Sequence, residues 1–245
     1  MLSKSLIFRI RVGFMKTSRK KILLLTFGVT LLLCVLFRAD VKISALVVSQ
    51  SDKIGVQSPI TQFAAQYLIK TKHTASYSYL QSVFFTCHAP AHSHSTDWSA
   101  RLAAEILGKY QTQDAFNLLI SIVSTKGQDI PCGFAEIPYG LSLFGEEYYS
   151  QLLEIAKDNK HGYARVNAIT AIGLMKPSHS HAVLDLSNVL YSTSDIFVQG
   201  RVLHAFFCIN TQESLIAKEE FVRNENFRYS IDVYPCSVEN IINTK

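Results

Sequence analysis

Acidic side chains are absent from the first 38 residues of this 245-residue chain, which carry eight basic side chains instead. The remaining residues hold 16 of the 24 Lys and Arg against all 19 Asp and Glu. The formal net charge of +5 therefore originates near the N-terminus, and residues 39–245 are mildly acidic. Nucleic-acid-binding domains carry clustered basic side chains on their folded surface. We therefore expect no nucleic-acid partner.

Short enzyme motifs are absent too. The sequence has no Gly-x-Ser-x-Gly, no phosphate-binding glycine loop, no His-Glu-x-x-His and no Cys-x-x-Cys. Two acidic pairs, at 146–147 and 219–220, are typical of solvated helix surfaces. We expect no catalytic residues, no cofactor and no enzymatic activity.

One long apolar run is present at residues 22–37, which read ILLLTFGVTLLLCVLF without a charged side chain. Sixteen helical residues rise about 24 Å, a little less than the ~30 Å hydrocarbon core, so Lys21 and Arg38 would reach to the two interfaces. A buried soluble helix, the alternative, usually has a wider polar stripe than Thr26 and Thr30 provide. The run predicts a transmembrane anchor.

The residues that flank this run predict its fate and orientation. Phe37 and Arg38 stand where a signal peptidase requires small residues, which favours a retained anchor over a cleaved signal peptide. The excess of basic side chains before the run favours a cytoplasmic N-terminus and an extracytoplasmic C-terminal domain, periplasmic in a Gram-negative cell. Met15 offers a second start, so translation of residues 1–14 stays open.

The rest of the chain is predicted to be all-α, because apolar residues recur at helical spacing and strand-like alternation is scarce. We expect regular structure to begin at Pro59, after a stalk. Asp97 is the expected N-cap of a helix through Lys109. The predicted organisation is listed in chain order: basic cytoplasmic tail 1–21, transmembrane anchor 22–37, stalk 38–58, helical cap region 59–96, helical repeats 97–225 and C-terminal tail 226–245.

From residue 97 onward the predicted helices form pairs that resemble one another. The first helix of a pair has an Arg near its start, Ala at inward positions and Gly at its end, and the second has an aliphatic run. These residues are Arg101, Arg165 and Arg201; Ala103, Ala104, Ala168, Ala171 and Ala205; Gly108, Gly145 and Gly173; and Leu118, Leu119, Leu152, Leu153, Leu186, Val189 and Leu190. This pattern resembles the HEAT repeat, in the short bacterial form shared with phycobilisome-lyase-type repeats.

The resemblance implies an α-solenoid. Small Ala side chains let paired helices approach, Gly is expected to end each first helix in a left-handed turn, and several pairs must stack to bury their apolar faces. An ordinary helical bundle is the alternative. HEAT-like stacks usually bind other proteins, so the resemblance implies a scaffold or adaptor with a protein partner of unknown identity. Some relatives are lyases or hydroxylases, which implies an enzyme as the alternative.

Five cysteines are present, and Cys34 lies within the apolar run. The other four are Cys87, Cys132, Cys208 and Cys236. An even number in an exported domain suggests disulfides, and four cysteines allow three connectivities. We favour Cys87 with Cys132 and Cys208 with Cys236, with free buried thiols as the alternative.

A histidine-rich segment follows Cys87. Its imidazoles, His88, His92 and His94, are weak candidates for a Zn or Cu site in an envelope metal-binding protein. A four-ligand site would need a second cluster, and the sequence offers none, so solvated histidines are the favoured reading. His204, on a predicted apolar helix, is expected to be a hydrogen-bonded core histidine.

Overall fold

The computed structural model describes residues 23–24, 26–30, 32–33, 39–86, 97–124, 136–160, 162–176, 181–225, 236 and 241–242. Among these residues all regular structure is helical and no strand occurs, which confirms the predicted all-α class. The elements are α2 (Ala39–Ser49), α3 (Ser51–Ile54), α4 (Pro59–Thr71), η1 (Thr74–Ser76), α5 (Tyr77–Val83), α6 (Trp98–Tyr110), α7 (Gln113–Val123), α8 (Ile137–Ser142), η3 (Glu146–Tyr148), α9 (Tyr149–Lys157), α10 (Gly162–Met175), α11 (His181–Tyr191), α12 (Ile196–Ile209) and α13 (Gln212–Asn224).

The chain divides into two compact units, Met1–Ile43 and Ser44–Lys245. In the first unit the described residues between 23 and 33 are helical, and their large apolar side chains are exposed. The predicted anchor at 22–37 lies partly outside the described residues, which omit 22, 25, 31 and 34–37. Among the helices that are described, none is both long and apolar enough to cross a bilayer.

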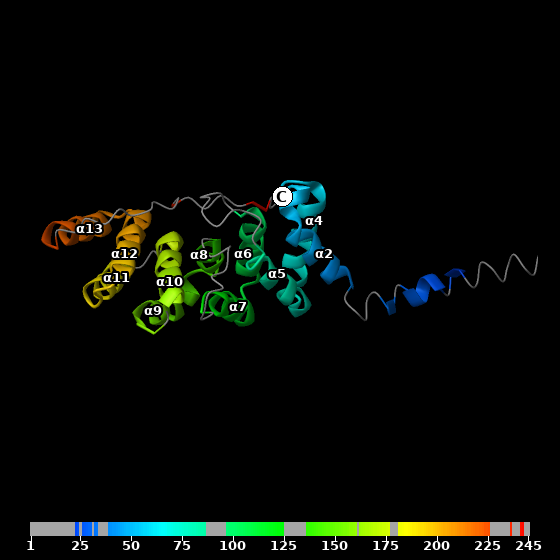
Figure 1. The fold of residues 1–245 in the computed structure, drawn as a ribbon, viewed down its shortest axis with the longest axis horizontal. Coiled ribbons are helices and arrows are strands. Elements are labelled where there is room, and N and C mark those ends of the chain that lie inside the picture. Colours follow the sequence, from blue (N-terminus) through cyan, green and yellow to red (C-terminus); the bar gives the residue numbers. More distant parts are fainter. Residues whose placement is uncertain are drawn as a thin grey trace, which may run out of the picture. The chain divides into compact units, whose positions relative to one another are not determined.

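The second unit consists of helices packed in chain order. The first helices of successive pairs, α6, α8, α10 and α12, pack against one another, and α4 packs against the outer side of α6. Helices α7, α9 and α11 lie along one side of this row, and α13 packs on α11 and α12 at its far end (Figure 1). The core therefore runs between the row of first helices and the helices beside it.

Side-chain caps fix where several of these helices begin. Asp97 is the N-cap of α6, as predicted, and its Oδ1 accepts a hydrogen bond from the Ala100 N–H at 3.0 Å. Thr112 and Asp195 act in the same way at α7 and α12, and Thr211 forms a capping box at α13. Polar caps before apolar runs thus determine where α6, α7, α12 and α13 begin.

The predicted helix-ending role of glycine is wrong for Gly108 and Gly173. Both lie inside their helices, and the left-handed residues that follow α6 and α10 are Gln111 and Lys176 instead. A Cβ at Gly108 would lie 2.9 Å from Leu143 Cβ, and one at Gly173 would lie 2.8 Å from Ala205 Cβ. These glycines therefore allow one first helix to approach the next. Gly145, with a φ of 80°, does follow the end of α8.

The prediction that regular structure begins at Pro59 is also wrong. Helices α2 and α3 occupy most of the segment that was expected to be a stalk. Ala45, Val48 and Ser51 are buried there, and Asp52 accepts hydrogen bonds from the backbone N–H and the hydroxyl of Ser99 at the start of α6. The buried face of these helices consists of small and β-branched residues interspersed with polar ones. Its helical periodicity is therefore hard to recognise in the sequence.

Two of the predicted repeat arginines join neighbouring elements. Arg165 in α10 is buried, and its Nε donates to the Ala156 carbonyl near the end of α9 at 2.7 Å. Burial lowers the pKa of Arg165, and the nearby carboxylates of Asp195 and Asp158 oppose this effect. Arg101 in α6 contacts Glu136 at 3.3 Å. Arg165 therefore links α10 to α9, and Arg101 links α6 to the residue that precedes α8.

Candidate functional site

The most unusual side chain in the second unit is Glu105, in the middle of α6. It has 0% solvent exposure although its neighbours along the helix are Ala104 and Ile106. Its Oε2 accepts a hydrogen bond from the Ile241 N–H at 2.9 Å, and its Oε1 accepts one from the Ile242 N–H at 3.3 Å. A buried carboxylate is costly without partners, and here two consecutive main-chain amides supply them.

The carbonyl of Ile241 is bound from the other side. Gln62 of α4 donates from its Nε2 to this oxygen at 3.1 Å, and Gln57 donates to it at 3.4 Å. Gln62 is itself fixed by donating to the Val56 carbonyl at 2.8 Å. We call Glu105, Gln62 and Gln57 together the Glu105 site. It binds the main chain of residues 241–242 through two N–H donors and one carbonyl acceptor of that main chain.

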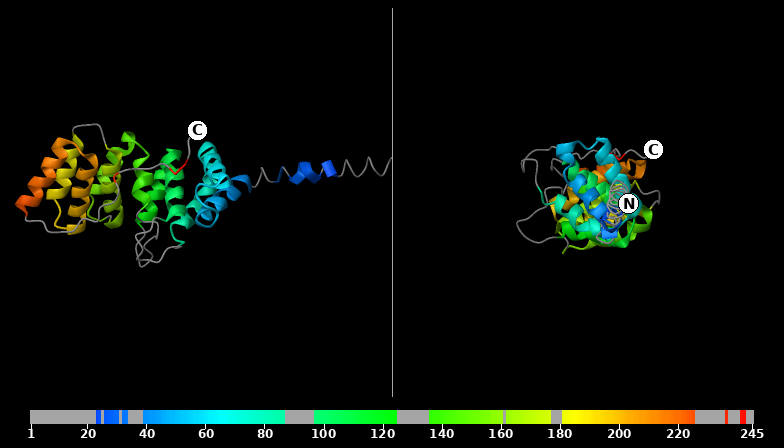
Figure 2. Two further views of the ribbon diagram at one scale, coloured as in Figure 1. Left: turned by 90° about the horizontal axis from the view of Figure 1, so that it is seen from above. Right: turned by 90° about the vertical axis from the view of Figure 1, so that its right-hand side faces the viewer.

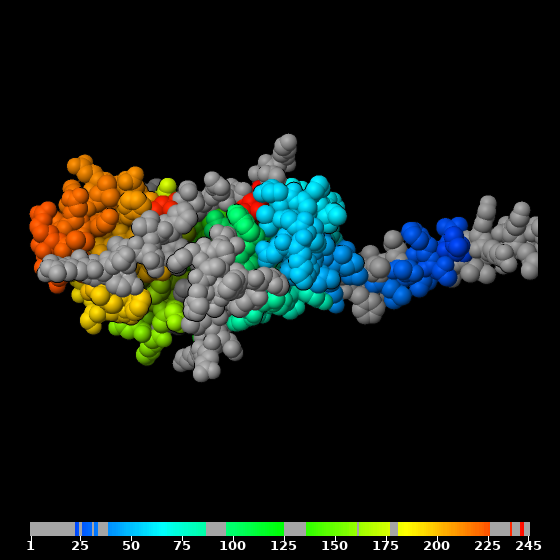
Figure 3. All heavy atoms as spheres, turned by 45° about the horizontal axis from the view of Figure 1, so that its top comes forward, coloured from blue at the N-terminus to red at the C-terminus, as the bar shows by residue number. Residues whose placement is uncertain are grey.

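The side chains of Ile241 and Ile242 are buried as well, at 4% and 1% exposure. Residues 241–242 lie beside α6 and α4 in the two ribbon views and in the space-filling view (Figures 1 to 3). The Glu105 site therefore combines polar recognition of a main chain with burial of two adjacent aliphatic side chains.

Basic and aromatic groups complete the surroundings of the carboxylate. Lys109, one turn along α6, places its Nζ 2.7 Å from Glu105 Oε1. Burial, with a further contribution from the charge of Glu105, raises the pKa of Tyr139 to about 12, so its hydroxyl stays protonated near neutral pH. The guanidinium carbon of Arg101 lies 3.2 Å from the centroid of the Tyr139 ring. Lys109 thus offsets a charge that solvent cannot reach.

A second attachment of the C-terminal tail lies at α12. Cys208 and Cys236 form a disulfide, which confirms this half of the predicted pairing. Cys208 lies in α12, so the disulfide joins this helix to Cys236. Only residues 237–240 separate it from Ile241, so the tail is held covalently close to the Glu105 site.

Buried His204 lies against this disulfide. Its Nε2 is 3.6 Å from Cys208 Sγ and 4.0 Å from Cys236 Sγ. The donor atoms of His204, Cys208 and Cys236 all lie within 4.8 Å of one another, which is a spacing that a metal ion could bridge. The sulfurs are bonded to each other, however, and are not thiolate ligands in this state.

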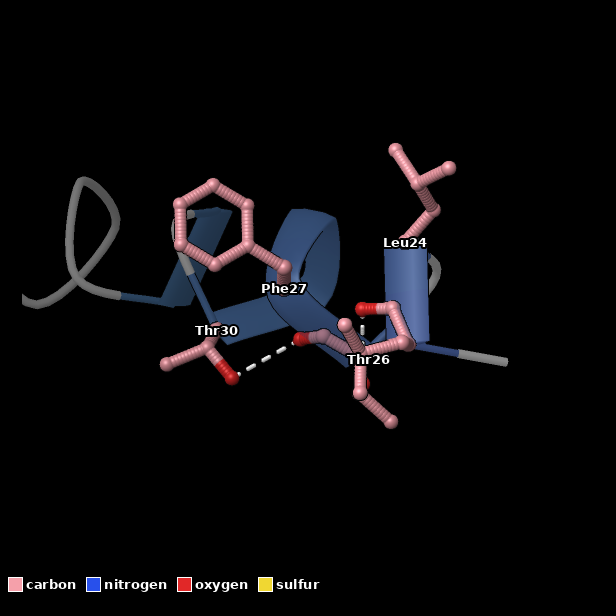
Figure 4. A pocket seen from close by; sticks show the side chains of 5 residues that line it. Leu24, Thr26, Phe27 and Thr30 are labelled. Carbon is pink, nitrogen blue, oxygen red and sulfur yellow. Dashed lines mark hydrogen bonds between the residues drawn. The ribbon is translucent and has the colours of Figure 1, made fainter. Parts of the chain in front are cut away.

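A hollow in the first unit is lined by Leu23, Leu24, Thr26, Phe27 and Thr30 (Figure 4). All of them belong to one short stretch of chain, and none is charged. The Thr30 hydroxyl donates to the Thr26 carbonyl at 2.8 Å, and the Thr26 hydroxyl donates to the Leu23 carbonyl at 2.9 Å. The hollow is thus the apolar surface of a single helical stretch, and we assign no ligand to it.

The other predicted site residues lie outside the described residues. These are the disulfide candidates Cys87 and Cys132 and the metal candidates His88, His92 and His94. Their pairing and their metal binding stay predictions.

No protein-family model and no curated protein matches this chain. The likeness to HEAT repeats therefore continues to rest on the residue pattern, and the function must be argued from the site.

Sequence reasoning missed the Glu105 site. A signal was available, because Glu105 is the single acidic residue in the apolar helix face around Ala103, Ala104, Ile106 and Leu107. A lone acid in such a face is buried with a partner when the helix packs on both sides. The identity of that partner, 136 residues further along the chain, could not be read from the pattern.

Proposed function

We propose that this protein is a membrane-tethered HEAT-like scaffold or adaptor that binds another protein and has no catalytic activity of its own. The observation that carries the proposal is the Glu105 site. Its polar groups hold the main chain of residues 241–242 rather than any polar side chain. Recognition of this kind suits the binding of a polypeptide segment.

The packing of the helices supports the solenoid part of this proposal. Gly108 of α6 lies against Gly140 and Leu143, and Gly173 of α10 lies against Ala205 of α12. The same device, a small residue at the crossing of two first helices, thus recurs between α6 and α8 and between α10 and α12. Recurrence of one contact between successive pairs is typical of repeat stacks.

Membrane attachment is supported by the surface of residues 23–33. Leu23, Leu24 and Phe27 are exposed, and the hydroxyls of Thr26 and Thr30 bond to main-chain carbonyls of their own helix. Such back-bonding leaves an apolar surface without unsatisfied polar groups, which is what a lipid environment requires. The span itself, residues 22–37, is part of the proposal.

The disulfide supports the proposed orientation. Structural disulfides persist in oxidising compartments outside the cytoplasm. The basic residues before the anchor would hold the N-terminus in the cytoplasm and leave the pair Cys208–Cys236 on the other side. The alternatives, an enzyme of the HEAT-like lyase type and a metal binder that uses His88, His92 and His94, stay predictions without a supporting contact.

Site-specific crosslinking tests the scaffold proposal. A photo-reactive phenylalanine analogue replaces Phe63, which is 70% exposed on α4 next to Gln62, in the full chain in its native membrane. We expect one discrete adduct with another protein. The matched control places the analogue at Leu184, which is 59% exposed on α11, and should give none. Absence of an adduct from both positions would contradict the proposal.

A further inference from the structure

We propose that the Glu105 site binds an aliphatic segment of the partner protein, in competition with residues 241–242 of the chain itself. The inference rests on the proposed function for the existence of a partner. It adds where that partner binds, what chemistry its segment must have and what occupies the site before it arrives.

The chemistry of the segment follows from the contacts. Glu105 requires two consecutive main-chain N–H groups, so neither of the two residues can be proline. Gln62 and Gln57 require the carbonyl of the first of them. The burial of Ile241 and Ile242 adds two adjacent aliphatic side chains. A matching segment therefore contains two adjacent aliphatic residues whose main-chain N–H groups are free to donate.

The buried charge explains why the chain's own tail occupies the site. An empty site would take both amide donors from the Glu105 carboxylate and leave Lys109 as its main partner, and a buried charge that loses its partners is costly. Residues 241–242 remove that cost until a partner segment replaces them. The exchange keeps the same number of hydrogen bonds, so it can proceed without a large net penalty.

The disulfide sets how strongly the tail competes. Four residues separate Cys236 from Ile241, and a short tether gives its attached segment an effective concentration of roughly millimolar. Reduction of the disulfide by a dithiol, which transfers two electrons and two protons to the two sulfurs, loosens this tether and favours the partner. The same tether disfavours a second oxidised copy as the occupant, because residues 241–242 of that copy are held near their own Glu105 site.

The test uses the full chain in detergent micelles and a fluorescent peptide of residues 236–245 with Ser in place of Cys236. The double substitution Ile241→Asn and Ile242→Asn removes the competing residues from the site. We expect the peptide to bind this variant at least about tenfold more tightly than the unaltered chain, by fluorescence anisotropy. A peptide with Asn at both Ile positions serves as the negative control.

The role of the carboxylate is tested in the same background. Glu105→Gln keeps the shape of the side chain but offers one acceptor oxygen instead of two, and we expect at least about a tenfold loss of peptide affinity. The matched control is Glu154→Gln, at an exposed carboxylate of α9 that pairs with Lys157. Equal peptide affinity for the unaltered chain and the Asn variant, or no effect of Glu105→Gln, overturns the proposal.

Hydrogen exchange of the unaltered chain covers the case in which a variant does not fold. Saturating peptide should accelerate exchange of the Ile241 and Ile242 amides, and unchanged protection overturns the proposal. A dimer that forms on reduction and requires Glu105 would make a second copy the occupant and would overturn it too.

Crosslinking at Phe63 separates this inference from the proposed function. An adduct that disappears in Glu105→Gln supports both. An adduct that persists unchanged in Glu105→Gln leaves the scaffold intact and overturns this site, whereas peptide binding without any native adduct overturns the scaffold alone.

Discussion

Gly173 and Ala205 illustrate how single residues set the spacing of the first helices. A methyl group at Gly173 would lie 2.8 Å from Ala205 Cβ and closer still to its Cα. We expect Gly173→Ala to lower the free energy of unfolding by about 1 to 3 kcal/mol, because overpacking outweighs the better helix propensity of Ala. Urea denaturation followed by circular dichroism measures the change.

The compensating substitution is the control for this prediction. Ala205→Gly removes the methyl group that the new side chain meets, so the double variant should be more stable than the sum of the two single effects predicts. Simple additivity of the two substitutions would show that the contact between α10 and α12 is not the cause.

Glu136 gives a prediction about pH. Burial raises the pKa of Glu136 above its usual 4.5, although the neighbouring Arg101 opposes the shift. The folded state therefore keeps the proton longer than the unfolded state, and its stability contribution is lost as pH rises through the folded pKa. We expect Glu136→Gln, which stays neutral, to gain melting temperature relative to the unaltered chain as the pH rises above 4.5. A relative loss over that range would contradict the assigned direction.

At the scale of elements, capping explains why the helix starts were predictable and the helix ends were not. Polar residues before apolar runs, such as Asp97, are local signals that the structure uses as expected. The ends depend on how a neighbour packs. The sequence alone suggests that Gly108 ends its helix. In the structure it lies inside α6, where α8 packs directly against it. A glycine can therefore either end a helix or allow two helices to pack closely, and only the tertiary packing shows which role it has.

Asp195, the N-cap of α12, allows the cap to be separated from charge. Its Oδ1 accepts from the Phe197 N–H at 2.9 Å and from the Val198 N–H at 3.4 Å. We expect Asp195→Ala to cost about 1 kcal/mol of stability and Asp195→Asn much less, since Asn preserves the cap. The charge of Asp195 also acts on buried Arg165. Thermal unfolding measures both variants. If Asp195→Asn lowers the melting temperature as much as Asp195→Ala, the loss comes from the charge and not from the cap.

On the scale of the whole molecule, the disulfide is the strongest constraint on the tail. Cys208 and Cys236 are 28 residues apart in sequence, and closing a loop of this length stabilises a fold by roughly 3 to 4 kcal/mol in the chain-entropy description. We expect a reducing dithiol to lower the unfolding midpoint accordingly. The double variant Cys208→Ser and Cys236→Ser should start at the lower midpoint and respond less. If the dithiol lowers the midpoint of the double variant as much as that of the unaltered chain, the effect comes from other cysteines.

The Cys208–Cys236 disulfide could be predicted from the sequence, whereas the Glu105 site could not. The even number of cysteines favoured disulfides, and this pair was preferred because it ties the C-terminal tail to the last predicted helix pair. The Glu105 site had no such local signal, because Glu105 and Ile241 meet only after α4 and α6 have packed together. Features that join neighbours in sequence were predictable, and features that join distant segments were not.

The distance along the chain between Glu105 and Ile241 has a consequence for biosynthesis. A ribosome adds Ile241 136 residues after Glu105, and until then the carboxylate lacks both amides that neutralise its burial. We expect the carboxylate to remain hydrated during this interval, because its burial without both amides is costly. A nascent or interrupted chain is therefore expected to expose Glu105 to water, which the folded chain buries completely.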